Sequence, residues 1–159
     1  MRNHPLTLRP VRLDDETFLL EVYASTRLEE LAQLPLDENQ RETFLKIQFA
    51  AQQQDYRRRF PNAEHSVIVL SDRQVGRVYV DRSDKELRIL DIALAAEHRN
   101  KGTGTRILRG LMDEARVLGK PVRVYVEQFN PALGLFERLG FSRSDDIGTH
   151  FLMEWRPGS

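Results

Sequence analysis

The architecture of this chain follows from the stretch Arg99-Asn100-Lys101-Gly102-Thr103-Gly104. Before it, the mostly apolar run from Leu87 to Leu94 predicts a strand. After it, apolar residues recur at helical spacing, at Ile107, Leu108, Leu111, Met112, Ala115 and Leu118. A basic, glycine-containing loop therefore joins a strand to the start of a helix. Free backbone N–H groups and the positive end of the helix dipole meet there, and this arrangement suits an anion, usually a phosphate.

Two common phosphate motifs are excluded at this loop. A dinucleotide fingerprint needs a third glycine where the chain has Ile107, and the dipeptide Gly119-Lys120 lacks the Ser or Thr of a Walker loop. The remaining pattern, Arg/Gln-x-x-Gly-x-Gly/Ala, resembles the acyl-CoA pyrophosphate loop of the GNAT superfamily of N-acetyltransferases. The resemblance implies acetyl-CoA as co-substrate, held by Arg99, Asn100, Lys101, Gly102, Thr103, Gly104 and Thr105.

Composition limits the class of protein. With 159 residues, 40% of them hydrophobic, the chain is expected to form one globular domain over residues 1–159. Lysine plus arginine equals aspartate plus glutamate, 24 against 24, so no net field attracts nucleic acid or an anionic membrane. There is no cysteine, the four histidines are dispersed, and no metal site is expected. No apolar segment resembles a signal or a membrane span, which predicts a cytoplasmic protein.

The remaining segments predict a mixed α/β order. Strands are expected from Leu6 to Arg12, in a hairpin of Ser66–Leu70 and Val75–Asp81, from Val122 to Glu127, and in a closing hairpin of Phe141–Asp146 and Thr149–Trp155. Helices are expected after Asp14, from Pro131 to Gly140, and after Asp37, where Gln40 completes a capping box and Phe44, Ile47 and Ala51 form the apolar side.

This order predicts a three-layer α/β fold, and it is also the order of the GNAT fold over nearly the whole chain. The resemblance implies a mixed, twisted sheet of about six to seven strands with helices on both faces. It also implies a splay between the two central parallel strands, and a bulge near the strand end Ile92-Ala93-Leu94 that frees main-chain groups for the pantetheine arm.

A second family signature lies between Asn130 and Phe141. It resembles Asn-x-x-Ala-x-x-Leu-Tyr-x-x-x-Gly-Phe, shortened by one residue after the asparagine, and it adds Asn130 and Phe136 to the cofactor-binding candidates. The family tyrosine that protonates the leaving thiolate is replaced by Phe136, which is expected to pack beside the CoA sulfur. Since a phenyl ring donates no proton, another group or water does so, or the thiolate leaves unassisted.

Two carboxylates are candidate bases. Asp91 lies within an apolar strand, where the alternatives are a base or substrate ligand and a structural pair with Arg77 or Arg88. Glu127 ends the strand that splays away, where it either deprotonates an amine or is a solvated strand-end residue. The N-terminal helices usually shape the acceptor site in this family, which makes Tyr23, Arg27, Glu29 and Glu30 substrate-binding candidates; the alternative for them is a solvated helix end.

The sequence therefore predicts an N-acetyltransferase that moves an acetyl group from acetyl-CoA to a primary amine of a small molecule or peptide. No covalent nucleophile is visible, so direct attack in a ternary complex is expected. The alternative is a non-catalytic acyl-CoA-binding or regulatory module, which the replacement at Phe136 leaves open. A monomer or a homodimer is compatible with the sequence.

Overall fold

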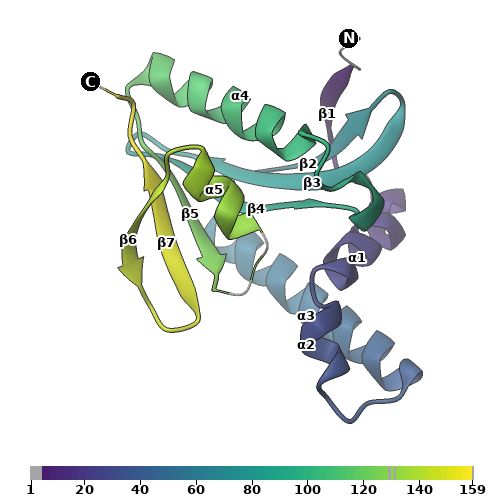
Figure 1. Cartoon of the computed structure of the whole chain (residues 1–159). Coiled ribbons are helices and arrows are strands. Elements are labelled where there is room, and N and C mark those ends of the chain that lie inside the picture. Colours follow the sequence, from purple (N-terminus) through teal and green to yellow (C-terminus); the bar gives the residue numbers. More distant parts are fainter. Residues whose placement is uncertain (1–4, 129, 131, 159) are drawn as a thin grey trace.

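The computed structural model describes residues 5–128, 130 and 132–158 and contains a seven-stranded mixed sheet with the strand order β1-β2-β3-β4-β5-β7-β6 (Figure 1). The strands are β1 (Leu6–Pro10), β2 (Glu64–Leu70), β3 (Arg73–Arg82), β4 (Leu87–Leu94), β5 (Val122–Glu127), β6 (Ser142–Asp146) and β7 (His150–Trp155). The pairing of β4 with β5 is parallel, and all the other pairs are antiparallel.

Helices cover both faces of this sheet. They are α1 (Glu16–Ser25), α2 (Leu28–Ala32), α3 (Glu38–Arg59), α4 (Thr103–Leu118) and α5 (Ala132–Arg138), with short 3-10 turns at Leu13–Asp15 and Ala96–His98. The larger core lies between the sheet, α4 and α5, and a smaller one joins α1 to α3 on the opposite face (Figure 1). The predicted three-layer fold is thereby confirmed. Among the described helices, none has the length and apolar character that a bilayer crossing requires.

Several strand and helix ends that the sequence predicts are found in the structure. Strand β4 has the predicted bounds, and α4 ends where Gly119 adopts a left-handed conformation with φ 68°. The β2–β3 turn places Ser71 and Asp72 at positive φ, as a tight hairpin requires. The expected cap at Asp14 is wrong. Asp15 occupies that position, and its carboxylate accepts from the Arg12 backbone N–H (2.7 Å) and pairs with Arg9 (2.8 Å).

The predicted apolar side of α3 is also wrong. The capping box of Asp37 and Gln40 forms, but Ile47 is 65% exposed, and Phe44 and Ala51 are exposed as well. The helix instead packs through Phe49, which lies against the α1 ring Tyr23, and through Gln52, Gln53 and Tyr56. Two polar side chains of this stripe have hydrogen-bonding partners on the sheet, Gln52 on β3 and Tyr56 on β4, whereas the buried Oε1 of Gln53 has none among the described residues.

The two central strands separate partway along their length. Their parallel pairing runs only from Leu87 opposite Val122 to Ile89 opposite Val124. At the same level the β3–β4 register shifts, because Tyr79 pairs with Asp91 and Val80 with Ile89, so that Leu90 forms a β-bulge. The expected splay is present, and the bulge lies two residues before the predicted segment Ile92–Leu94.

Candidate functional site

The loop before α4 has the geometry of an anion-binding nest. Asn100 and Gly102 adopt left-handed φ values of 62° and 83°, and the first bond of the helix runs from Arg106 N to Gly102 O (3.0 Å). The N–H groups of Thr103, Gly104 and Thr105 precede this bond, so they have no partner within the helix. A Cβ added to Gly102 would meet nothing within 4 Å, so the space beside this residue is open. These features fit a phosphate-bearing group.

The second glycine of the motif has a different task. A Cβ on Gly104 would lie 3.2 Å from Cδ2 of Leu135 and 3.8 Å from Cδ1 of Leu94. Gly104 therefore lets the first turn of α4 approach α5 and the end of β4 closely, and Thr103 beside it is buried as well. Lys101, in contrast, is exposed at the front of the loop.

Arg99 holds the loop to its surroundings. Its Nε donates to the Leu94 carbonyl (3.1 Å), and its Nη2 donates to Oγ of Ser25 at the end of α1 (2.8 Å). Although the sequence motif made Arg99 a candidate phosphate ligand, its guanidinium is directed at protein atoms here. It therefore fixes the end of β4 relative to the helices on the other face.

The end of β4 combines a close backbone approach with an edge that lacks a strand partner. Ile92, Ala93 and Leu94 pair with β3 on one edge, but β5 has already separated from the other. A Cβ on Gly76 of β3 would lie only 2.3 Å from the Ala93 carbonyl oxygen, so glycine is needed for this approach. The freed carbonyl of Leu90 accepts from the Tyr56 hydroxyl (2.9 Å).

Glu127 and Arg27 meet on the other side of the splay. Nη1 of Arg27 lies 2.5 and 2.6 Å from the two carboxylate oxygens of Glu127, although the residues are 100 positions apart. The Arg27 guanidinium also lies 5.0 Å from the Tyr23 ring centroid, and Glu30 is 3.6 Å away. Burial lowers the pKa of Arg27, but the hydrogen bond and charge of Glu127 outweigh this and raise it above its ordinary value. Glu29 is exposed on α2.

The carboxylate of Asp91 forms a structural pair. Its Oδ2 accepts from Nε of Arg77 (2.7 Å) and lies 2.5 Å from Nη2, which also donates to Gln52 (2.7 Å). Arg77 is 1% exposed, so the ion pair neutralises a cation that would otherwise be buried alone. The other partner considered from the sequence, Arg88, pairs with Glu86 instead (3.2 Å).

Tyr56 is a site residue that the sequence interpretation missed. Burial is the main reason that the pKa of its phenol lies above the ordinary value, so the group stays protonated and acts as a hydrogen-bond donor. The available signal was the spacing of Phe49, Gln52 and Tyr56, which lie on one face of α3. It was overlooked because two of the residues on that face, Gln52 and Gln53, are polar.

Two candidates from the second signature, Phe136 and Asn130, make contacts within the protein. Phe136 is 1% exposed, and its ring packs edge-on against Phe141 with centroids 5.2 Å apart; its expected position beside the CoA sulfur stays a prediction. A side chain without a hydroxyl group has no polar atom that must remain accessible, and it completes the core instead. Oδ1 of Asn130 accepts from the Ala132 N–H (2.9 Å) at the start of α5.

Comparisons with known proteins agree with this geometry. Residues 26–141 match the model of the acetyltransferase (GNAT) family. The PaiA N-acetyltransferase of Thermoplasma acidophilum, in complex with coenzyme A, superposes with a TM-score of 0.70 at 18% identity, covering 96% of this chain and 99% of that one. The ribosomal-protein-S18-alanine N-acetyltransferase of Escherichia coli gives 0.63 at 16%, covering 98% and 96%. No curated protein sequence matches the chain.

Proposed function

The chain belongs to the acetyltransferase (GNAT) family, and we propose that it transfers an acetyl group from acetyl-CoA to a primary amine of a small molecule or peptide. The observation that carries this proposal is the separation of β4 from β5 beyond Ile89 and Val124. The anion-binding nest and the freed edge of β4 lie on one side of this splay, and the Arg27–Glu127 pair lies on the other. We further propose that residues 1–159 form one domain and that it acts in the cytoplasm.

In this proposal the backbone of the nest would hold the co-substrate. The N–H groups of Thr103, Gly104 and Thr105 suit the pyrophosphate, and the main chain of Ile92–Leu94 suits the pantetheine arm. Acetyl-CoA supplies an activated thioester carbonyl. Since the nest belongs to a helix that packs on the sheet, the donors are ordered before the ligand arrives, which favours precise positioning.

We propose that Glu127 receives the proton of the attacking amine. An amine must be neutral to attack, yet it is mostly protonated at neutral pH. The Glu127 carboxylate is partly exposed, and Arg27 orients it. Since both of its oxygens already lie against Arg27, we expect the proton to pass through water to solvent. Asp91, held by Arg77, is expected to position β4.

The proposal is tested by measuring thiol release from acetyl-CoA over a panel of amines. The panel contains small polyvalent amines, single amino acids and peptides with free N-termini. The peptides are included because one of the superposed proteins is a ribosomal-protein-S18-alanine N-acetyltransferase. Turnover of any member at a rate that scales with enzyme concentration supports the proposal. Tight acetyl-CoA binding without turnover on the whole panel would favour the non-catalytic module, and the absence of binding would contradict both functions.

A further inference from the structure

The side of α3 opposite its packed side is apolar at its centre and exposed. Ile47 is 65% exposed, and Phe44 and Ala51, three residues before it and four after it, are exposed as well. These three residues are called the outer face below. From Glu38 to Ile47 every residue except Leu45 is exposed, so about three turns of the helix have little packing of their own. Because helices in proteins are stabilised mainly by packing of an apolar face, a partner on the outer face would stabilise α3.

The two ends of α3 carry opposite charges. Asp37 and Glu38 stand at its beginning, whereas Arg57, Arg58 and Arg59 form its last turn. All five side chains are exposed. The helix therefore presents an acidic end, an apolar centre and a basic end to its surroundings.

A second set of charges extends the outer face in both directions. Arg41 precedes Phe44 by three residues, and Asp55 follows Ala51 by four, so both lie on the same side of the helix as the outer face. Asp55 pairs with two arginines of its own helix, at 2.8 and 3.2 Å. Since such exposed pairs contribute little, they leave the carboxylate able to meet a further cation.

We propose that a second copy of this chain covers the outer face, with the two α3 helices antiparallel about a two-fold axis beside Ile47. Phe44 of one copy then lies against Ala51 of the other, because the two residues are equally distant from the axis. Arg41 faces Asp55 of the other copy, twice by symmetry. The acidic beginning of each helix meets the basic end of its counterpart.

The charges select both the occupant and its direction. A parallel pair of helices would set Arg41 against Arg41 and Asp55 against Asp55, whereas the antiparallel pair opposes unlike charges and opposite ends of the two helix dipoles. A face that complements itself in this way fits a second copy, and such a contact closes at two subunits. The contact is confined to one 22-residue helix per copy, and small interfaces bind weakly, so we expect a dissociation constant of about 10–100 µM.

The first test is sedimentation equilibrium of the full chain from about 1 to 500 µM, a range that brackets this constant. The natural chain should pass from monomer to dimer as its concentration rises. Ile47→Asp should stay monomeric, because it sets two carboxylates against each other at the axis. Val117→Asp is the control, since Val117 is an apolar residue of α4 that is 87% exposed, and this variant should dimerise like the natural chain. Unchanged circular dichroism shows that the variants fold.

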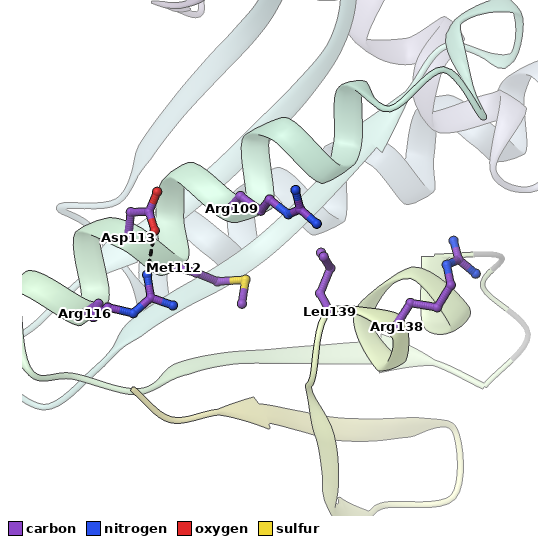
Figure 2. A pocket seen from close by; sticks show the side chains of 6 residues that line it. All are labelled: Arg109, Met112, Asp113, Arg116, Arg138 and Leu139. Carbon is purple, nitrogen blue, oxygen red and sulfur yellow. Dashed lines mark hydrogen bonds and ion pairs between the residues drawn. The ribbon is translucent and has the colours of Figure 1, made fainter. Parts of the chain in front are cut away.

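The second test exchanges charges between the copies. Arg41→Glu and Asp55→Arg should each weaken dimerisation about tenfold or more, because each sets like charges together twice. An equimolar mixture of the two variants should dimerise like the natural chain, since the unlike charges meet again. Asp113→Arg is the matched control for the pair that Asp55→Arg removes from its own helix. Asp113 pairs with Arg116 three residues later on α4 (2.6 Å; Figure 2), and its loss should leave dimerisation unchanged.

Three outcomes would overturn the proposal. A natural chain that stays monomeric over the whole range would show that a second copy does not occupy the outer face. A dimer that Ile47→Asp leaves intact would place the contact elsewhere on the molecule. A mixture of Arg41→Glu and Asp55→Arg that associates no better than either variant alone would exclude the antiparallel arrangement.

Discussion

A pH-dependent loss of stability should originate at His65. The imidazole stacks on the Tyr79 ring with centroids 4.3 Å apart, and its buried Nε2 has no hydrogen-bond partner among the described residues. Burial, followed by the positive charges of Arg77 and Arg57, lowers the pKa of His65 from 6.5 to about 3. The folded protein therefore holds His65 neutral at a pH where the unfolded chain protonates it.

The sign and size of the effect follow from proton linkage. Between pH 6.5 and pH 3 the unfolded chain binds more protons at this position, so the free energy of unfolding falls as the pH falls. For pKa values of 6.5 and about 3, the loss between pH 7 and pH 5 is about 2 kcal/mol. For a chain of this length, that corresponds to a decrease in Tm of roughly 4–8 °C.

The assay is urea unfolding at pH 7, 6 and 5, followed by circular dichroism, for the natural chain and two variants. His65→Phe keeps a ring against Tyr79 but cannot be protonated, so it should lose this part of the pH dependence. Asp15→Asn is the matched control. Arg9 leads the interactions that hold the Asp15 pKa below its ordinary value of 3.8, so this variant should lower stability at both pH 7 and pH 5 while keeping the slope between them. An unchanged slope in His65→Phe would refute the reasoning.

Three further predictions concern the site and its support. Glu127→Gln should lower kcat at least about tenfold and flatten the acidic limb of the pH–rate profile, while acetyl-CoA affinity, measured by calorimetry, stays nearly constant. An unaltered acidic limb would show that another group is the base. Gly104→Val should weaken acetyl-CoA binding at least tenfold, about 1.4 kcal/mol, because its side chain would push α4 away from Leu135 and displace the nest; equal affinity in a folded variant would contradict this. Phe49→Ala should lower the free energy of unfolding in urea by about 3–5 kcal/mol, and Ile47→Ala by less than about 0.5 kcal/mol. Equal losses in the two variants would contradict the observed orientation of α3.

The parts of the fold that could be predicted are those with local causes. The apolar run of β4, the left-handed turn before α4 and the glycine after it each depend on residues that are close in sequence. The helical repeat of α4 buries Leu108 and Ala115 completely, so its inward face could be assigned from the pattern alone. These elements define the nest, and the nest geometry agrees with the loop motif.

The orientation of α3 could not be predicted in the same way. Phe44, Ile47 and Ala51 repeat at helical spacing as well as Phe49, Gln53 and Tyr56 do. The choice depends on partners distant in sequence: Tyr56 donates to Leu90 of β4, and Gln52 accepts from Arg77 of β3. A polar stripe is buried when such partners are available, and hydropathy by itself carries no information about them.

The site shows the same dependence on distant contacts, with a consequence for its chemistry. Both Arg27 and Glu127 were candidates from the sequence, but as a substrate ligand and a base with no connection between them. Their contact means that an acceptor amine approaching Glu127 competes with Arg27 for the same carboxylate oxygens. Because one oxygen cannot serve both partners fully, amine binding should loosen the pair. Removal of the arginine should therefore leave the Glu127 carboxylate without the partner that fixes its position, so Arg27→Gln is expected to lower kcat for thiol release while acetyl-CoA affinity, measured by calorimetry, stays nearly constant.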